Sequence, residues 1–190
     1  MTLYKNRYRI ESARLKGWDY SSEGYYFITI CTKNRIPFFG RIKNKKMILN
    51  DIGKIAEKYW MEIPDHFQFI KLDSFIIMPD HIHGIIIINN SMGRDKVLPC
   101  LYHNNDQIHN NIKMKQLSRY QNPGKGSIST IIGSYKSICT RMINQKNKNL
   151  NFTWLSRFHD RIIRNENELI RKRKYIENNP EKAVFMQRRD

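Results

Sequence analysis

The sequence contains no long apolar run, and no stretch approaches the roughly 18 consecutive apolar residues that a membrane-spanning helix needs. The N-terminal stretch MTLYKNRYRI lacks the apolar centre of a secretory signal. The three cysteines are an odd number without close pairing, which argues against a disulfide scaffold. Together these absences favour a reduced, cytoplasmic protein.

Acidic residues are also scarce. Lysine and arginine total 34 against 17 aspartates and glutamates, which gives a formal net charge of +17 and a pI near 9.9. The first 50 residues contain only three acids. An excess of this size indicates a polyanionic partner, for which nucleic acid is the first candidate. The alternative is a solvated basic surface without a specific ligand.

Hydrophobic spacing predicts alternating strands and helices. The expected strands are 25–32, 67–79, 81–89 and 152–164, and the expected helices are 48–63, 127–142 and 165–179. This order predicts an α+β fold of the ferredoxin-like or RRM-like split β-α-β type, with an antiparallel sheet, helices on one face and an extra C-terminal helix. Many unrelated functions use this layout, so it does not fix the function.

The 190 residues are expected to form one domain, 1–190, that carries an insertion. Between about 89 and 127 the chain is rich in Asn, Gly and Lys and has no clean hydrophobic period. This composition predicts a flexible inserted loop.

Two histidines, His81 and His83, begin the apolar run of MPDHIHGIIII (78–88). Residues two apart in a strand point to the same face, with Cα atoms roughly 6.5 to 7 Å apart, so the two imidazoles could share one divalent ion. Gly84 beside them leaves room for a backbone or a substrate. Two histidines alone do not make a metal site, and the alternative is a pair of satisfied polar residues at a strand end.

The C-terminal helix contributes Tyr175 and Asn179, which are four residues apart and lie on one helical face. Taken alone, they fit a packing tyrosine and a C-terminal cap before Pro180. Taken with the histidines and the charge, Asn179 could be a third ligand and Tyr175 could direct its phenol at what the ion binds. A phenol beside a divalent ion in a basic protein suggests nucleophilic attack on a phosphodiester.

Several segments resemble the HUH single-tyrosine transposases, and within them the REP-associated tyrosine transposases of the insertion-sequence-200-like class. These segments are RLKGWDYSSEGYYFITICT (14–32), LDSFIIMPDHIHGII (72–86), GSYKSICTRMIN (133–144), RFHDRIIRNENEL (157–169) and YIENNP (175–180). The combination of MPDHIHG with YIxxNP is the most specific part. The stretch FHDR (158–161) departs from the family, which often has Tyr and His at its second and fourth positions.

The resemblance implies that His81, His83 and Asn179 bind Mg²⁺ or Mn²⁺ and that Tyr175 forms a 5′-phosphotyrosine link to single-stranded DNA. The expected function is then a metal-dependent single-strand endonuclease and strand transferase, a transposase, that cuts and rejoins DNA at hairpin-bearing sites. One alternative is a non-catalytic protein of the same fold that binds single-stranded hairpin DNA. Another is a metal-dependent phosphodiester hydrolase, for which Asp80 or Asp160 could be the base.

Further residues are candidates to contact DNA. Basic side chains would hold the backbone and tryptophans would stack on unpaired bases. The candidates are Arg14, Lys136, Arg157 and Arg161 for the backbone, and Trp18 and Trp154 for stacking. For each of them an ordinary surface or core role is an equal alternative. Whether the protein is a monomer or a homodimer stays open.

Overall fold

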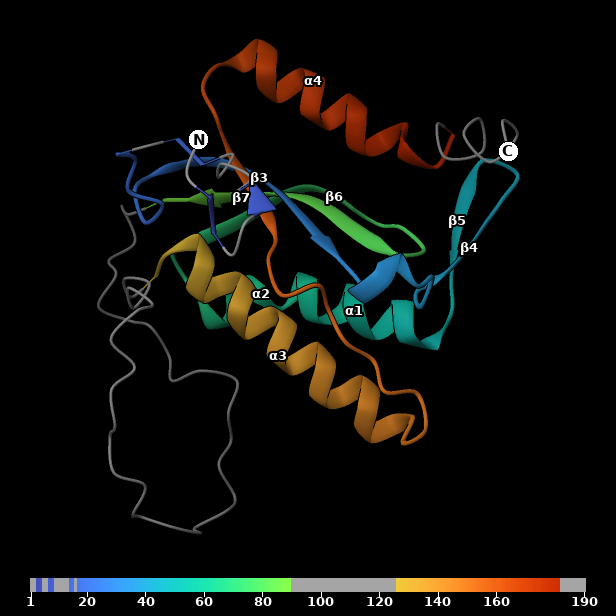
Figure 1. The fold of residues 1–190 in the computed structure, drawn as a ribbon. Coiled ribbons are helices and arrows are strands. Elements are labelled where there is room, and N and C mark those ends of the chain that lie inside the picture. The colour runs from blue at the N-terminus through green and yellow to red at the C-terminus, as the bar shows by residue number, and fades with distance from the viewer. Residues whose placement is uncertain (1–2, 5–6, 9–13, 16, 90–125, 182–190) are drawn as a thin grey trace, which may run out of the picture.

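The computed structural model describes residues 3–4, 7–8, 14–15, 17–89 and 126–181 (Figure 1). Its centre is a four-stranded antiparallel sheet in the order β6-β7-β3-β8. The strands are β3 (Gly24–Cys31), β6 (Ile70–Ile77), β7 (His81–Ile88) and β8 (His159–Ile163). The α+β prediction with a split β-α-β antiparallel sheet is confirmed.

Helices cover both faces of the sheet (Figure 1). On one face lie α1 (Asp51–Met61) and α3 (Ile128–Lys146), and on the other lies the C-terminal α4 (Glu166–Glu177). Side chains alternate along a strand, so β3 serves both layers. Tyr26, Ile28 and Ile30 belong to the large core with α1 and α3, whereas Phe27 belongs to a small cluster under α4.

The helix starts follow from local capping. Asn50, Ser127 and Asn165 each accept a hydrogen bond from the backbone N–H three residues on, as an N-cap residue does. Helix α4 ends at Glu177 with Asn178 as its C-cap, so Asn179 lies just beyond this helix rather than within it.

Shorter elements complete the described part. They are β1 (Leu3–Tyr4), β2 (Arg7–Tyr8), η1 (Lys33–Arg35), β4 (Gly40–Lys43), β5 (Lys46–Leu49) and α2 (Ile63–His66). Several expected boundaries shift. The second strand starts at Ile70 instead of 67, and the helix after Ser127 runs to Lys146 instead of 142. Residues 48 and 49 belong to β5, so the helix starts at Asp51, and the last strand starts at His159 instead of 152.

Strand β7 lies between β3 and β6 and is buried on both faces, as the isoleucine run predicts. The structure explains the glycine at position 84 differently from the sequence analysis, which expected room for a backbone or a substrate. A Cβ there would clash with the indole of Trp60 from α1, so the glycine admits a core side chain and not a substrate.

The predicted insertion at 89–127 falls almost entirely outside the described residues. The described helices include none that is long and apolar enough to cross a membrane.

Candidate active site

The two histidines lie side by side on the sheet face that α4 covers. Register pairs His81 with Cys31 and His83 with Thr29, all on strands β7 and β3. The two imidazole ring centroids are 4.6 Å apart, with the ring planes at 75°. The strand spacing thus brings the two rings together on one face.

Hydrogen bonds at Nδ1 fix the orientation of both rings. His83 Nδ1 lies 2.8 Å from Thr29 Oγ1, and His81 Nδ1 lies 2.6 Å from Asp80 Oδ1. Asp80 Oδ2 in turn pairs with Arg35 Nε at 2.8 Å. Because Nδ1 is occupied in both rings, each Nε2 is left for another partner. A carboxylate behind a histidine is the arrangement that commonly orients a metal-binding imidazole.

Burial keeps His83 uncharged. His83 is 5% exposed, and burial, with the nearby positive charges of His81, Arg35 and Lys172, lowers its pKa to about 3. His83 is therefore a neutral imidazole near neutral pH, which is the form that binds metals. Burial alone would raise the pKa of the Asp80 carboxyl, but the hydrogen bond to His81 and the charges of His81 and Arg35 hold it below its ordinary value.

Tyr175 lies against the same histidine. Its Oη is 3.4 Å from His83 Nε2, although the two residues are 92 positions apart in the chain. The ring of Phe27 stacks on His83 at 5.4 Å and meets Tyr175 edge-on at 5.9 Å, so it holds the two rings in place. The Lys172 ammonium lies 4.2 Å from the centre of the Phe27 ring and 5.8 Å from that of Tyr175. Tyr175 remains 37% exposed, so its phenol is open to a substrate.

Packing and one ion pair place α4 over the sheet. Leu169 and Ile176 are buried against Phe27, Ile85 and Ile163. Between these two residues in the helix, Arg173 donates two hydrogen bonds to Asp73 on β6, at 2.6 and 3.0 Å. The hydrogen bond from Arg173 is the main cause that lowers the pKa of the Asp73 carboxyl.

Asn179 is buried, at 7% exposed, just past the end of α4. In the described part of the chain, no hydrogen bond joins its side chain to either histidine, so its role as the third ligand stays a prediction. Among the described residues, no three His, Cys, Asp or Glu side chains cluster as a metal site. A metal held by His81 and His83 would therefore need an amide such as Asn179, water or substrate to complete its ligands. The donor set is two fixed imidazoles that turn Nε2 to the α4 side, where Nε2 of His83 contacts the Tyr175 hydroxyl, and it fits a divalent ion with open positions.

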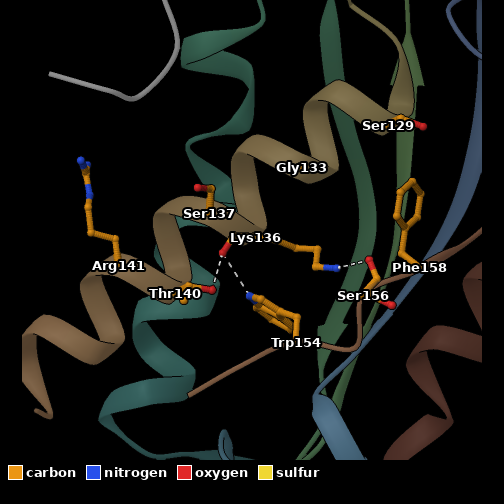
Figure 2. Close-up of a pocket in the computed structure, with 9 residues that line it drawn as sticks. All are labelled: Ser129, Gly133, Lys136, Ser137, Thr140, Arg141, Trp154, Ser156 and Phe158. Carbon is orange, nitrogen blue, oxygen red and sulfur yellow. Dashed lines mark hydrogen bonds between the residues drawn. The ribbon is translucent and has the colours of Figure 1, made fainter. Parts of the chain in front are cut away.

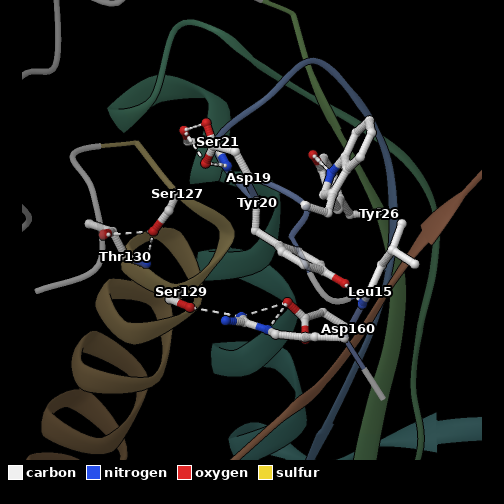
Figure 3. Close-up of polar contacts among 11 residues, drawn as sticks. Leu15, Asp19, Tyr20, Ser21, Tyr26, Ser127, Ser129, Thr130 and Asp160 are labelled. Carbon is white, nitrogen blue, oxygen red and sulfur yellow. Dashed lines mark hydrogen bonds and ion pairs between the residues drawn. The ribbon is translucent and has the colours of Figure 1, made fainter. Parts of the chain in front are cut away.

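Two of the predicted DNA contacts, Arg14 and Trp18, are engaged within the chain. Arg14 pairs with Asp160 at 2.6 Å and also donates to Ser129 on α3. Figure 3 labels the two partners, Ser129 and Asp160. Trp18 is 39% exposed and donates to the hydroxyl of Tyr26. Their part in binding DNA stays a prediction.

Of the other four candidates, Trp154 and Arg157 lie on the segment that leads to β8, Arg161 lies in β8 itself, and Lys136 lies on α3. Lys136 donates to the backbone carbonyls of Leu155 and Ser156, and Trp154 is 8% exposed and donates to the Lys136 carbonyl (Figure 2). Arg157 is exposed, and Arg161 pairs with Glu168 at 3.1 Å. Burial makes Trp154 a packing residue, and base stacking by it stays a prediction.

The sequence reasoning missed the residues that support the histidines: Phe27, Thr29, Arg35 and Lys172. The alternation of 25–32 could have placed Phe27 and Thr29 on one face. Their partners depend on the register of β3 with β7, which no local pattern shows.

A protein of Haemophilus influenzae (strain ATCC 51907 / DSM 11121 / KW20 / Rd), itself uncharacterized, is 37% identical over 172 residues, which cover 89% of this chain and 87% of that protein. The chain belongs to the family of that protein. No family model matches it.

Two solved structures are similar to this chain. The structure of a REP-associated tyrosine transposase bound to a REP hairpin is similar with a TM-score of 0.50 and 17% identity, over 96% of this chain and 74% of that chain. A Deinococcus radiodurans R1 protein provisionally classed as a transposase gives a TM-score of 0.47 and 13% identity, over 87% of this chain and 97% of that chain. The first likeness shows that the family has the mixed α+β fold of a transposase.

Proposed function

We propose that this protein is a metal-dependent single-strand DNA endonuclease and strand transferase, a transposase of the HUH single-tyrosine type. The contact of Tyr175 with His83 is the observation that carries the proposal. A tyrosine with only a packing role would not need to place its hydroxyl on a buried, neutral imidazole while its side chain stays partly exposed.

In this proposal Tyr175 Oη attacks the phosphorus of a DNA phosphodiester. A Tyr–O–P bond forms at the 5′ side, the P–O3′ bond breaks, and a free 3′-OH leaves with a proton. Attack by a 3′-OH on the phosphotyrosine reverses the exchange and rejoins strands. One diester replaces another at each step, so no nucleoside triphosphate is needed.

His81, His83 and Asn179 would hold Mg²⁺ or Mn²⁺ beside the phenol. When bound, the ion would polarise the scissile phosphate and offset the charge that develops on its oxygens. With a pKa of about 3, His83 does not retain the phenol proton near neutral pH, which favours a ligand role over a base role. The cations of Lys172 and Arg161 on the same face favour a phosphate there.

Single-stranded DNA with a hairpin is the proposed substrate. The net charge of +17 suits a nucleic acid. The neighbour in fold was solved with a REP hairpin, and that observation supports, for this chain, a substrate of the same kind.

Both carboxylates named as bases for the hydrolase alternative are already engaged by other side chains. Asp160 is paired with Arg14, and its position in β8 points it to the α3 face, away from the histidines. Asp80 is bonded to both His81 and Arg35 and has a lowered pKa, which weakens it as a base.

The test is incubation with a labelled single-stranded hairpin oligonucleotide, with and without Mn²⁺. We expect a protein–DNA adduct that survives denaturation, and its loss in Tyr175→Phe. Tyr25→Phe is the matched control, because Tyr25 is also 37% exposed and lies on the same face of the sheet. An adduct that persists in Tyr175→Phe refutes the assignment of the nucleophile. Cutting without any adduct in the wild type refutes the phosphotyrosine step.

A further inference from the structure

A groove of about 630 Å³ runs along one side of α3, on the face of the sheet opposite Tyr175 (Figures 1 and 2). Its first wall is a stripe of α3, and its second wall is the segment before β8. The lining residues are Ser129, Gly133, Lys136, Ser137, Thr140, Arg141, Trp154, Ser156 and Phe158. Lys136 ties the walls together through the carbonyls of Leu155 and Ser156.

The chemistry of the groove suits a phosphate backbone. None of the nine lining residues is acidic, two are cationic and four carry hydroxyl groups. Gly133, on the α3 wall, leaves space in the groove, because nothing lies within 4 Å of where its Cβ would be. Hydroxyl and cationic side chains are the usual donors to phosphate oxygens.

One wall of this groove continues onto the catalytic face. Phe158 lines the groove, and the next residue, His159, begins β8, which is the edge strand of the sheet. His159 pairs with Thr29, the residue bonded to His83, and Arg161 pairs with Phe27. His159 and Arg161 are exposed and share the face of the two metal-site histidines. Only two strand spacings, roughly 10 Å, separate β8 from β7.

We propose that the α3 groove and the exposed side of β8 form one track for single-stranded DNA. A strand lies along α3, turns around the edge of the sheet at His159, and reaches Tyr175. This track rests on the proposed function, since it names how the substrate of that site arrives. A single strand can make such a turn because its backbone bends freely, whereas smooth bending of a duplex costs several kcal/mol even over 20 to 30 base pairs.

Gly133 offers a test that leaves the fold intact. Gly133→Glu places a carboxylate in the groove, and Gly133→Gln adds the same bulk without the charge. Both replace a glycine inside a helix, so both are expected to keep or raise the melting temperature. Arg141→Ala removes a groove cation, and Lys71→Ala is its control, because Lys71 is exposed on the opposite edge strand, β6.

The measurement is fluorescence anisotropy with oligothymidylates of about 6 and about 20 nucleotides, lengths that bracket common single-strand site sizes. For the longer strand we expect roughly tenfold weaker binding by Gly133→Glu than by Gly133→Gln. For Arg141→Ala we expect the slope of log Kd against log salt to fall by about 0.7. The short strand and Lys71→Ala should show neither effect.

Equal affinities of the Glu and Gln variants for the long strand overturn the track, as does tighter binding of a duplex than of a single strand. The proposed DNA track and the proposed transposase chemistry can be refuted independently of each other. If the charge and length effects appear but Tyr175 forms no adduct, the track stands and the transposase proposal falls. If Tyr175 forms adducts on long strands equally in both Gly133 variants, the chemistry stands and the track falls.

Discussion

At the scale of single residues, the histidines are defined by what holds them. Thr29 and Asp80 each occupy one Nδ1, so both rings are fixed, and Arg35 holds the Asp80 carboxylate in turn. The backbone of Arg35 is left-handed, with φ of 58°, a conformation that non-glycine residues adopt at a cost. The strained residue is the one whose guanidinium pairs with Asp80.

The role of Asp80 predicts an effect on metal binding. Asp80→Ala removes the carboxylate that orients His81, so the affinity for Mn²⁺ should fall by about 10- to 100-fold, as is typical for residues behind a metal ligand. Asp80→Asn keeps the shape and an acceptor oxygen, and should lose less. Isothermal titration of Mn²⁺ measures this without any turnover. Asp65→Ala, an exposed acid on α2, is the control, and an unchanged Kd in Asp80→Ala contradicts the role.

At the scale of elements, the position of α4 decides where Tyr175 lies, and the pair Arg173–Asp73 ties this helix to β6. Arg173 lowers the pKa of Asp73 in the folded state, so the stabilisation is complete above the ordinary value near 3.8 and is lost as the pH falls below it. Asp73→Asn should lower the Tm by roughly 2 to 4 °C at pH 7, and by almost nothing near pH 3. Thermal melts at both pH values test this against Asp65→Asn. An equal shift at both pH values contradicts the ion pair as the cause.

Elements with long, regular patterns could be predicted from the sequence, and short ones could not. The isoleucine run predicted the central strand, and the stripe after Ser127 predicted α3 with its cap. The β4–β5 hairpin had no such signal. Its turn at Asn44 and Lys45 has φ of 51° and 59°, and lysine is unusual where a left-handed pair is required, so the usual Asn-Gly signature is absent.

At the scale of the whole molecule, the site depends on a contact between residues 92 positions apart. Strand spacing could place His81 and His83 together, but nothing in the periodicity of α4 says over which sheet face it packs. The histidine pair and the basic charge suggested that Tyr175 joins the histidines, and the resemblance to a family strengthened that grouping. The support by Phe27 and Thr29 needed the register of three strands.

Replacing either of two glycines by alanine should change the stability of the whole domain, in opposite directions. At Gly84, the indole of Trp60 fills the space that a Cβ would take, and this contact joins α1 to the central strand. Gly84→Ala should therefore destabilise the domain by about 1 to 3 kcal/mol through overpacking. At Gly133 a Cβ meets nothing within 4 Å, so Gly133→Ala should stabilise it by about 0.5 to 1 kcal/mol through helix propensity.

Urea denaturation of both variants measures the two free energies of unfolding, and an unchanged m value confirms that the change is in stability. Because the substitution is the same at both positions, its effect on the unfolded chain is nearly the same. The difference in sign then reports on the folded state alone. If Gly84→Ala is as stable as Gly133→Ala, Trp60 does not pack on β7 as described. The packing of α1 against the strand that carries His83 is then wrong.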